Sequence, residues 1–123
     1  MRVLIVDDEE PLRKLLHHGV QAEGATVGEA GTAEDALALA QSGGAPAVAL
    51  CDIRLPGRDG LWLAEQLHLG FPETVVLMTT GVLEFNAAVH SLQSGVMDYP
   101  VKPFSRERLT EAVSRAFLAH TRR

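Results

Sequence analysis

Three short and nearly continuous apolar runs constrain the fold of this chain of 123 residues more than any other feature. They are Val3–Val6, Ala47–Cys51 and Thr74–Met78. Runs of this kind are typical of strands that are covered on both faces, as the strands of a parallel sheet are. Parallel strands need long crossover connections, which are usually helices. The runs therefore predict an α/β domain.

The segments between the runs carry the signals of helices. After the first run, apolar residues recur at helical spacing between a proline suited to a first helical position and a glycine suited to a helix end. Hydroxyl side chains suited to capping precede the second and the last of these segments. The predicted helices begin near Pro11, Thr32, Leu61, Glu84 and Ser105, and two further strands are predicted at Ala25–Gly28 and Val96–Val101.

Five strands that alternate with five helices predict a parallel sheet with helices on both faces, because each crossover must be right-handed and carry a helix. Pro100 has no backbone N–H to donate, so the fifth strand should lie at a sheet edge. This fits the strand order 2-1-3-4-5, the flavodoxin-like arrangement, which we adopt from the known class of such folds. The length suits one compact domain, so we take residues 1–123 as a single domain.

Composition argues against several functions. The formal net charge of −5 argues against nucleic-acid binding by this domain, since phosphate contacts need a basic surface. No apolar run approaches the roughly 20 residues of a membrane span, and we expect no secretory leader. The expected compartment is therefore the cytoplasm. Cys51 is the single cysteine, and its apolar neighbours predict a buried, inert thiol.

Three carboxylates follow two of the predicted strands. Asp7 and Asp8 come after the first run, and Asp52 comes after the third. In the predicted order these two strands meet where the winding direction reverses, which is where open α/β sheets bind ligands. Like charges this close cost stability unless a cation neutralises them, and Mg²⁺ prefers oxygen ligands. Three solvated loop acids are the alternative, and placement alone leaves the two interpretations about equal.

Two further strand ends favour the magnesium site. The fourth strand is followed by Thr79 and Thr80, which offer hydroxyl groups, and the fifth is followed by Lys102, which offers an ammonium. A carboxylate, a metal, a hydroxyl and a lysine together supply the charge neutralisation and positioning that phosphoryl transfer requires. Each residue alone is a weak signal, but the combination predicts phosphoryl chemistry.

These residues resemble the receiver domains of two-component response regulators, over essentially the whole chain. The resemblance implies a phosphorylation switch, and by it Asp52 accepts the phosphoryl group. The matching segments are Val6-Asp7-Asp8-Glu9, the run from Cys51 to Gly60, Met78-Thr79-Thr80-Gly81 and the run from Tyr99 to Phe104.

The resemblance also implies the other roles at the site. Thr79 and Lys102 would hold phosphate oxygens, and the bond between Lys102 and Pro103 would be cis, which is uncommon without such a context. The implied ligands of Mg²⁺ are Asp8, Asp52 and the backbone carbonyl of Arg54 directly, and Asp7 through water.

Tyr99 stands where the family commonly has a switch aromatic. The phosphate would draw Thr79 inward and vacate space for Tyr99. This movement would remodel the surface of helix four, strand five and helix five, which would be the output face. An ordinary tyrosine on an edge strand is the alternative.

Three positions at the mouth of the predicted pocket should tune the lifetime of the phosphorylated form. Arg54 could attract the phosphodonor or obstruct the attacking water. Thr80 stands where the family often has a smaller residue, so it would narrow access to Asp52. Gly81 has no side chain that could orient a hydrolytic water. We therefore predict slow dephosphorylation.

The resemblance implies partners as well. A sensor histidine kinase or a phosphotransfer protein would donate the phosphoryl group, and an effector domain or a downstream protein would respond. The domain would be no enzyme beyond catalysing its own phosphorylation and dephosphorylation. Excision from a longer regulator and a complete protein are equally expected, and a homodimer through helices four and five is left open.

Other interpretations compete at single residues. An aspartyl-phosphate phosphatase would need a second acid two residues after Asp52, where Arg54 stands. A flavodoxin-like cofactor binder would need a phosphate loop after the first strand, where acids would repel the phosphate. His17 and His18 are adjacent on a helix and point apart, so they make a poor pair of metal ligands. Trp62 is expected to pack rather than to mark an interface.

Overall fold

The computed structural model describes residues 1–79, 81, 96–98 and 100–122. Its centre is a sheet of five parallel strands in the order β2-β1-β3-β4-β5. This confirms the predicted flavodoxin-like order and the position of the fifth strand at a sheet edge. The strands are β1 (Arg2–Val6), β2 (Thr26–Ala30), β3 (Val48–Asp52), β4 (Val75–Thr79) and β5 (Val96–Asp98).

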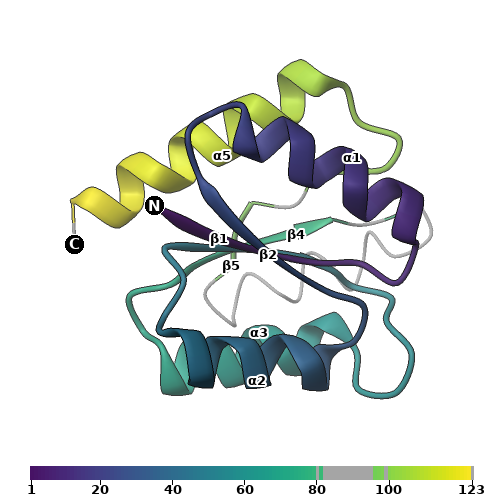
Figure 1. Ribbon diagram of the computed structural model, residues 1–123, viewed down its shortest axis with the longest axis vertical. Coiled ribbons are helices and arrows are strands. Elements are labelled where there is room, and N and C mark those ends of the chain that lie inside the picture. Colours follow the sequence, from purple (N-terminus) through teal and green to yellow (C-terminus); the bar gives the residue numbers. More distant parts are fainter. Residues whose placement is uncertain (80, 82–95, 99, 123) are drawn as a thin grey trace.

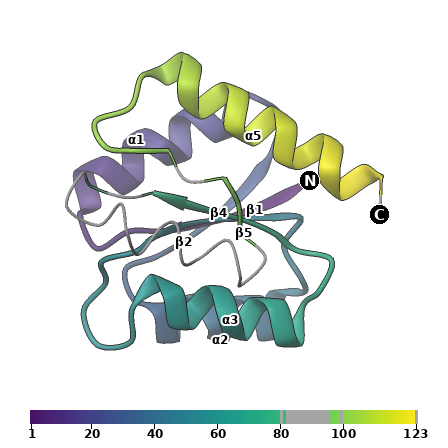
Figure 2. The same ribbon diagram turned by 180° about the vertical axis from the view of Figure 1, so that it is seen from behind.

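Helices cover both faces of the sheet (Figure 1). On one face lie α1 (Glu10–Gln21) and α5 (Arg106–Thr121), and on the other lie α2 (Ala33–Gly43) and α3 (Gly60–Gly70). Figure 2 shows the same layers from behind. The helix predicted from Glu84 to Ser94 lies outside the described residues. Within the described part of the chain, no helix has both the length and the apolar character to cross a bilayer.

Local capping signals identify the starts of the helices. Thr32 Oγ1 accepts a hydrogen bond from the Asp35 amide at 3.1 Å, and Ser105 Oγ accepts one from the Arg108 amide at 3.0 Å. Both caps agree with the prediction. Asp59 Oδ1 also caps α3, by accepting a hydrogen bond from the Trp62 amide at 2.9 Å. Each cap satisfies an amide that the first helical turn leaves without an intrahelical partner.

The two weaker strands differ from the prediction in their bounds. β2 continues to Ala30, because its parallel pairing with β1 extends until Val6 lies opposite Ala30. β5 ends at Asp98 rather than at Val101. Pro100 lacks the backbone donor that would continue the ladder, which accounts for part of the shortening.

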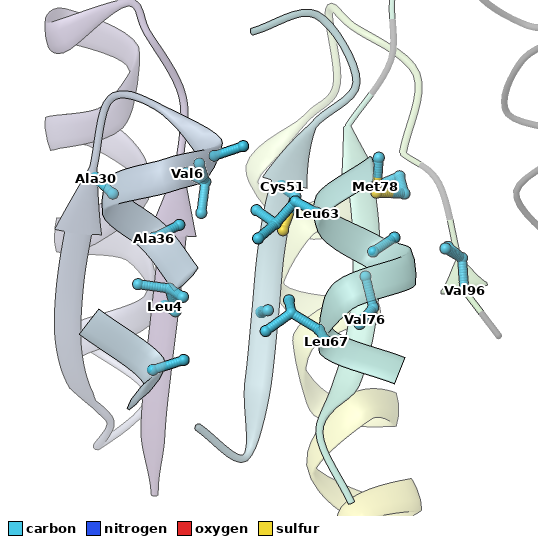
Figure 3. Close-up of a cluster of buried hydrophobic side chains, with 14 of the residues drawn as sticks. Leu4, Val6, Ala30, Ala36, Cys51, Leu63, Leu67, Val76, Met78 and Val96 are labelled. Atoms are coloured by element: carbon cyan, nitrogen blue, oxygen red, sulfur yellow. The ribbon is translucent and has the colours of Figure 1, made fainter. Parts of the chain in front are cut away.

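The apolar runs are strands that are buried on both faces. In β1, Val3 and Ile5 pack with α1 and α5, whereas Leu4 and Val6 pack with α2 and α3. Figure 3 shows the second layer, in which Leu63 and Leu67 of α3 face the sheet. Because both faces are covered, successive strand residues are all apolar and show no alternation with polar residues.

Cys51 belongs to this core. Its side chain is fully buried, which agrees with the predicted inert thiol. Burial, followed by the charge of Asp52, raises the pKa of the thiol to about 12. The reactive thiolate is therefore scarce at neutral pH.

Candidate functional site

Four segments that are distant in the sequence end at one edge of the sheet. Asp7 follows β1, Asp52 ends β3, Thr79 ends β4, and Lys102 lies after β5. Asp52 and Thr79 are direct partners in the parallel register of β3 and β4. The carboxyl ends of parallel strands share one edge of the sheet, and this brings the predicted residues together.

Lys102 joins two of these strand ends. Its Nζ donates to Asp7 Oδ2 and to Asp52 Oδ2, each at 3.0 Å. The Lys102 side chain is 21% exposed, and the two carboxylates are 1% and 9% exposed. The peptide bond between Lys102 and Pro103 is cis, as expected. One ammonium therefore lies between two largely buried carboxylates.

The three aspartates form a cluster that fits a hard cation. Asp7, Asp8 and Asp52 can each offer a carboxylate oxygen within 4.8 Å of the others. Asp8 is exposed, whereas the other two are buried. Asp52 Oδ1 also accepts a hydrogen bond from the Arg54 amide at 3.1 Å. A cluster of carboxylate oxygens with one exposed member suits Mg²⁺, which usually takes one or two carboxylates and several waters.

The charges at the site depend on one another. Burial raises the pKa of Asp52, Lys102 opposes the rise, and the Asp7 carboxylate adds to it. Burial lowers the pKa of Lys102, but hydrogen bonds to Asp7 and Asp52 outweigh burial, so the pKa of Lys102 is raised overall. Lys102 is therefore a cation at neutral pH. Lys102 pairs with two of the three carboxylates and supplies a single positive charge, so a further positive charge would stabilise the cluster.

Thr79 carries a buried hydroxyl that has no hydrogen-bond partner among the described residues. The residue is 1% exposed. Its backbone carbonyl accepts a hydrogen bond from the Ile53 amide at 3.1 Å, which ties the end of β4 to the residue after Asp52. Leaving a buried hydroxyl unpaired costs about 1–3 kcal/mol. Such a group is a candidate to bind a ligand.

Gly60 is a site residue that the sequence pattern did not single out. A Cβ atom at this position would lie 2.1 Å from the Asp52 carbonyl oxygen and 2.8 Å from the Ile53 Cα. The Gly60 amide donates to the Ile53 carbonyl at 2.9 Å. The start of α3 therefore lies directly against the backbone at Asp52, and only glycine fits there without displacement.

A charged cluster beside the site was also not predicted. Glu29 on β2 accepts hydrogen bonds from Arg13 and Lys14 of α1 and pairs with His17 of the same helix. A second nitrogen of Arg13 donates to the Asp7 carbonyl at 2.8 Å. The spacing of four residues between Arg13 and His17 indicates that both side chains lie on one side of the helix. Their shared partner Glu29 lies on β2, which the spacing does not indicate.

Glu29 should contribute stability that is lost in acid. Burial raises its pKa, but hydrogen bonds from His17, Lys14 and Arg13 outweigh burial and lower the pKa from 4.5 to about 2. Since the folded state releases this proton more readily than the unfolded state, the stabilisation is present above about pH 4.5 and is lost as the pH falls towards 2. Urea unfolding should show the parent losing more stability than Glu29→Gln across this window. Equal losses would contradict the contribution of Glu29.

The remaining predicted positions are only partly described. Thr80 and Tyr99 lie outside the described residues, so their roles stay predictions. The Arg54 side chain is exposed and Gly81 is half-buried, and the tuning roles of both also stay predictions.

The rival interpretations at single residues also have outcomes. Trp62 packs against the core, with the Arg58 guanidinium 5.3 Å from the centre of a Trp62 ring, as the packing interpretation expects. His17, one of the two adjacent histidines, pairs with the Glu29 carboxylate.

The chain matches known proteins along most of its length. The response regulator receiver domain family matches residues 3–114. The C4-dicarboxylate transport transcriptional regulatory protein DctD of Rhizobium meliloti (strain 1021) is 33% identical over 114 residues, which cover 93% of this chain and 25% of that protein. The transcriptional regulatory protein AruR of Pseudomonas aeruginosa is 40% identical over 119 residues, which cover 94% of this chain and 47% of that protein. The chain thus spans about a quarter of DctD and about half of AruR.

A solved structure agrees with these matches. The crystal structure of the receiver domain of NtrX from Brucella abortus has a TM-score of 0.89 and 34% sequence identity, over 94% of this chain and 98% of that domain. Fold and sequence therefore agree, and the chain belongs to the response regulator receiver domain family.

Proposed function

We propose that this receiver domain accepts a phosphoryl group on Asp52 and acts as a switch that depends on this modification. The arrangement around Asp52 carries the proposal: its carboxylate binds the Lys102 ammonium at 3.0 Å, and its register partner Thr79 has a buried hydroxyl without a partner among the described residues. A carboxylate, a cation and a hydroxyl donor are the groups that a phosphoryl group in transfer needs.

Asp52 would act as the nucleophile. One of its carboxylate oxygens attacks the phosphorus atom of a phosphorylated donor, the bond from phosphorus to the donor's leaving atom breaks, and an acyl phosphate forms on Asp52. Lys102, which binds Asp52 Oδ2, would then pair with a phosphate oxygen. The Thr79 hydroxyl would donate to another phosphate oxygen and so gain a partner.

The residues around Asp52 fit a Mg²⁺ ion. Asp8, Asp52 and the backbone carbonyl of Arg54 would hold the ion directly, and Asp7 would hold it through water. The two Asp7 oxygens already accept hydrogen bonds from the Glu9 amide at 2.9 Å and from Lys102 at 3.0 Å, which suits an indirect role. When bound, the ion would neutralise charge on the phosphoryl oxygens beside the carboxylates.

The switch would run from Thr79 to the output face. In this proposal the phosphate draws the Thr79 hydroxyl to itself, Tyr99 takes the vacated space, and the surface of helix four, β5 and α5 changes. The phosphodonor would be a sensor histidine kinase or a phosphotransfer protein, and the target would be an effector domain or a downstream protein. The relatives DctD and AruR are named transcriptional regulatory proteins, which is the context that such an effector would have. Residues 1–123 would form one receiver domain.

Intact mass spectrometry tests the proposal. The purified chain is incubated with acetyl phosphate and Mg²⁺, and we expect the addition of one phosphoryl group. Asp52→Asn and a sample treated with a metal chelator should show none. Asp59→Asn is the matched control: it alters an aspartate of the same loop, but asparagine caps a helix as well as aspartate does, so the adduct should remain.

Three outcomes would count against the proposal. They are an adduct that persists in Asp52→Asn, an adduct that is lost equally in Asp59→Asn, and the absence of any adduct on the folded parent chain with either acetyl phosphate or phosphoramidate.

A further inference from the structure

Arg13 on α1 links the acidic cluster of Asp7, Asp8 and Asp52 to Glu29 on β2. We propose that Arg13 is a positioning residue: held by Glu29, it fixes the backbone at Asp7 and thereby sets the geometry in which the aspartates bind Mg²⁺. The inference rests on the proposed function, since the magnesium site is part of that function. It assigns a role in this site to Arg13 on α1 and Glu29 on β2, neither of which is a proposed ligand of Mg²⁺ or of the phosphoryl group.

The contacts of Arg13 carry the inference. Its Nε donates to Glu29 Oε1 at 2.9 Å, and its Nη1 donates to the Asp7 carbonyl at 2.8 Å. The Arg13 side chain is 17% exposed and the Glu29 side chain is 14% exposed, so water competes little for either contact. The guanidinium is planar, so anchoring one edge on Glu29 directs the remaining N–H groups.

Asp7 depends on Arg13 for the last of its hydrogen bonds. The Asp7 amide donates to the Ala30 carbonyl at 3.1 Å, and its two carboxylate oxygens accept from Glu9 and Lys102. The Asp7 carbonyl is the fourth polar group, and Arg13 binds it. Removing Arg13 would leave the carbonyl of the fully buried Asp7 without a partner among the described residues, so the backbone would be free to rotate towards another donor.

The Asp7 carbonyl matters for Asp8 because the peptide unit between them is planar. Fixing the carbonyl therefore fixes the direction in which the chain enters Asp8, the exposed member of the cluster. Groups that orient metal ligands without touching the metal typically change metal affinity when they are removed. Arg13 orients the acidic cluster in this way through the Asp7 carbonyl, and Glu29 does so indirectly by holding Arg13.

Lys14 offers a matched control. It binds the same Glu29 carboxylate at 3.1 Å, but its side chain is 53% exposed, and among the described residues it makes no hydrogen bond or ion pair with Asp7. Loss of Lys14 removes a cation of equal charge from the same cluster. If Mg²⁺ affinity falls more when Arg13 is replaced than when Lys14 is replaced, the difference therefore reports the contact of Arg13 with the Asp7 backbone and not the loss of charge.

Calorimetric titration with Mg²⁺ alone tests the inference. We expect Arg13→Met to weaken Mg²⁺ binding about tenfold, as for other groups that orient metal ligands. Lys14→Met should stay within about twofold of the parent, because exposed ion pairs contribute little. Arg13→Lys should fall between the two, since a single ammonium replaces the fork that reaches both acceptors. This conservative variant also serves if Arg13→Met does not fold.

Amide hydrogen exchange in metal-free protein gives a second readout. The Glu9 amide donates to the Asp7 carboxylate, so its hydrogen should exchange faster in Arg13→Met than in the parent. In Lys14→Met its exchange rate should equal that of the parent. Equal Mg²⁺ affinity of Arg13→Met and the parent would overturn the inference, as would equal losses in Arg13→Met and Lys14→Met. If the parent bound no Mg²⁺, the proposed function would fail, and unchanged exchange at Glu9 in Arg13→Met would separately overturn the role of Arg13.

Discussion

Replacing Lys102 with methionine should lower the free energy of unfolding by roughly 3 kcal/mol in metal-free buffer at neutral pH, because breaking a buried ion pair leaves uncompensated charge. Methionine keeps the length of the side chain but not its charge. The Asp7 and Asp52 carboxylates, which share the Lys102 ammonium, would then face each other without it. Urea unfolding measures the loss. Phosphorylation of Asp52 by acetyl phosphate should fall about a hundredfold or more, as when a preorganised electrostatic group is removed.

Two comparisons separate the charge effect from a packing effect. Adding Asp52→Asn to Lys102→Met should restore part of the lost stability, because one of the two facing charges is gone. Mg²⁺ should also stabilise Lys102→Met more than it stabilises the parent, since the ion replaces the missing positive charge. If Lys102→Met unfolds at the same urea concentration as the parent with and without Mg²⁺, the ammonium does not hold the acidic cluster together.

Replacing Gly60 with alanine should destabilise the domain by about 3 kcal/mol, near the upper end for overpacking a buried position. The added methyl group would lie 2.1 Å from the Asp52 carbonyl oxygen, and backbone cannot move aside as the end of a side chain can. Either α3 or the loop after β3 must shift. Because the loop follows Asp52, phosphorylation should slow as well. Denaturant unfolding and the mass measurement report the two effects.

Gly70 provides the control on the same helix. A Cβ atom at Gly70 would meet nothing within 4 Å. Gly70→Ala should therefore be neutral or stabilise the domain by about 0.5 kcal/mol, through the better helix propensity of alanine. Similar unfolding midpoints for the two alanine variants would show that the contact between Gly60 and Asp52 does not constrain the fold.

Much of the fold could be predicted from local patterns. Apolar runs with no alternation indicate strands covered on both faces, and caps such as Thr32 and Ser105 indicate where helices begin. These signals depend on neighbouring residues, so they can be read from the sequence. The weaker strands were placed less well, since the bounds of β2 and β5 follow from pairing with β1 and β4.

The sequence by itself determined which residues stand at a strand end or in the loop that follows it, and in a parallel sheet all of these ends share one edge. Asp7, Asp52, Thr79 and Lys102 could therefore be named before any coordinates were known. Only the tertiary structure decided how they meet. Lys102 reaches across 95 residues to Asp7, and Arg13 reaches the Asp7 backbone while Glu29 of another strand holds it. Such contacts depend on the distance between elements and on the directions of side chains, and no local pattern of residues encodes either.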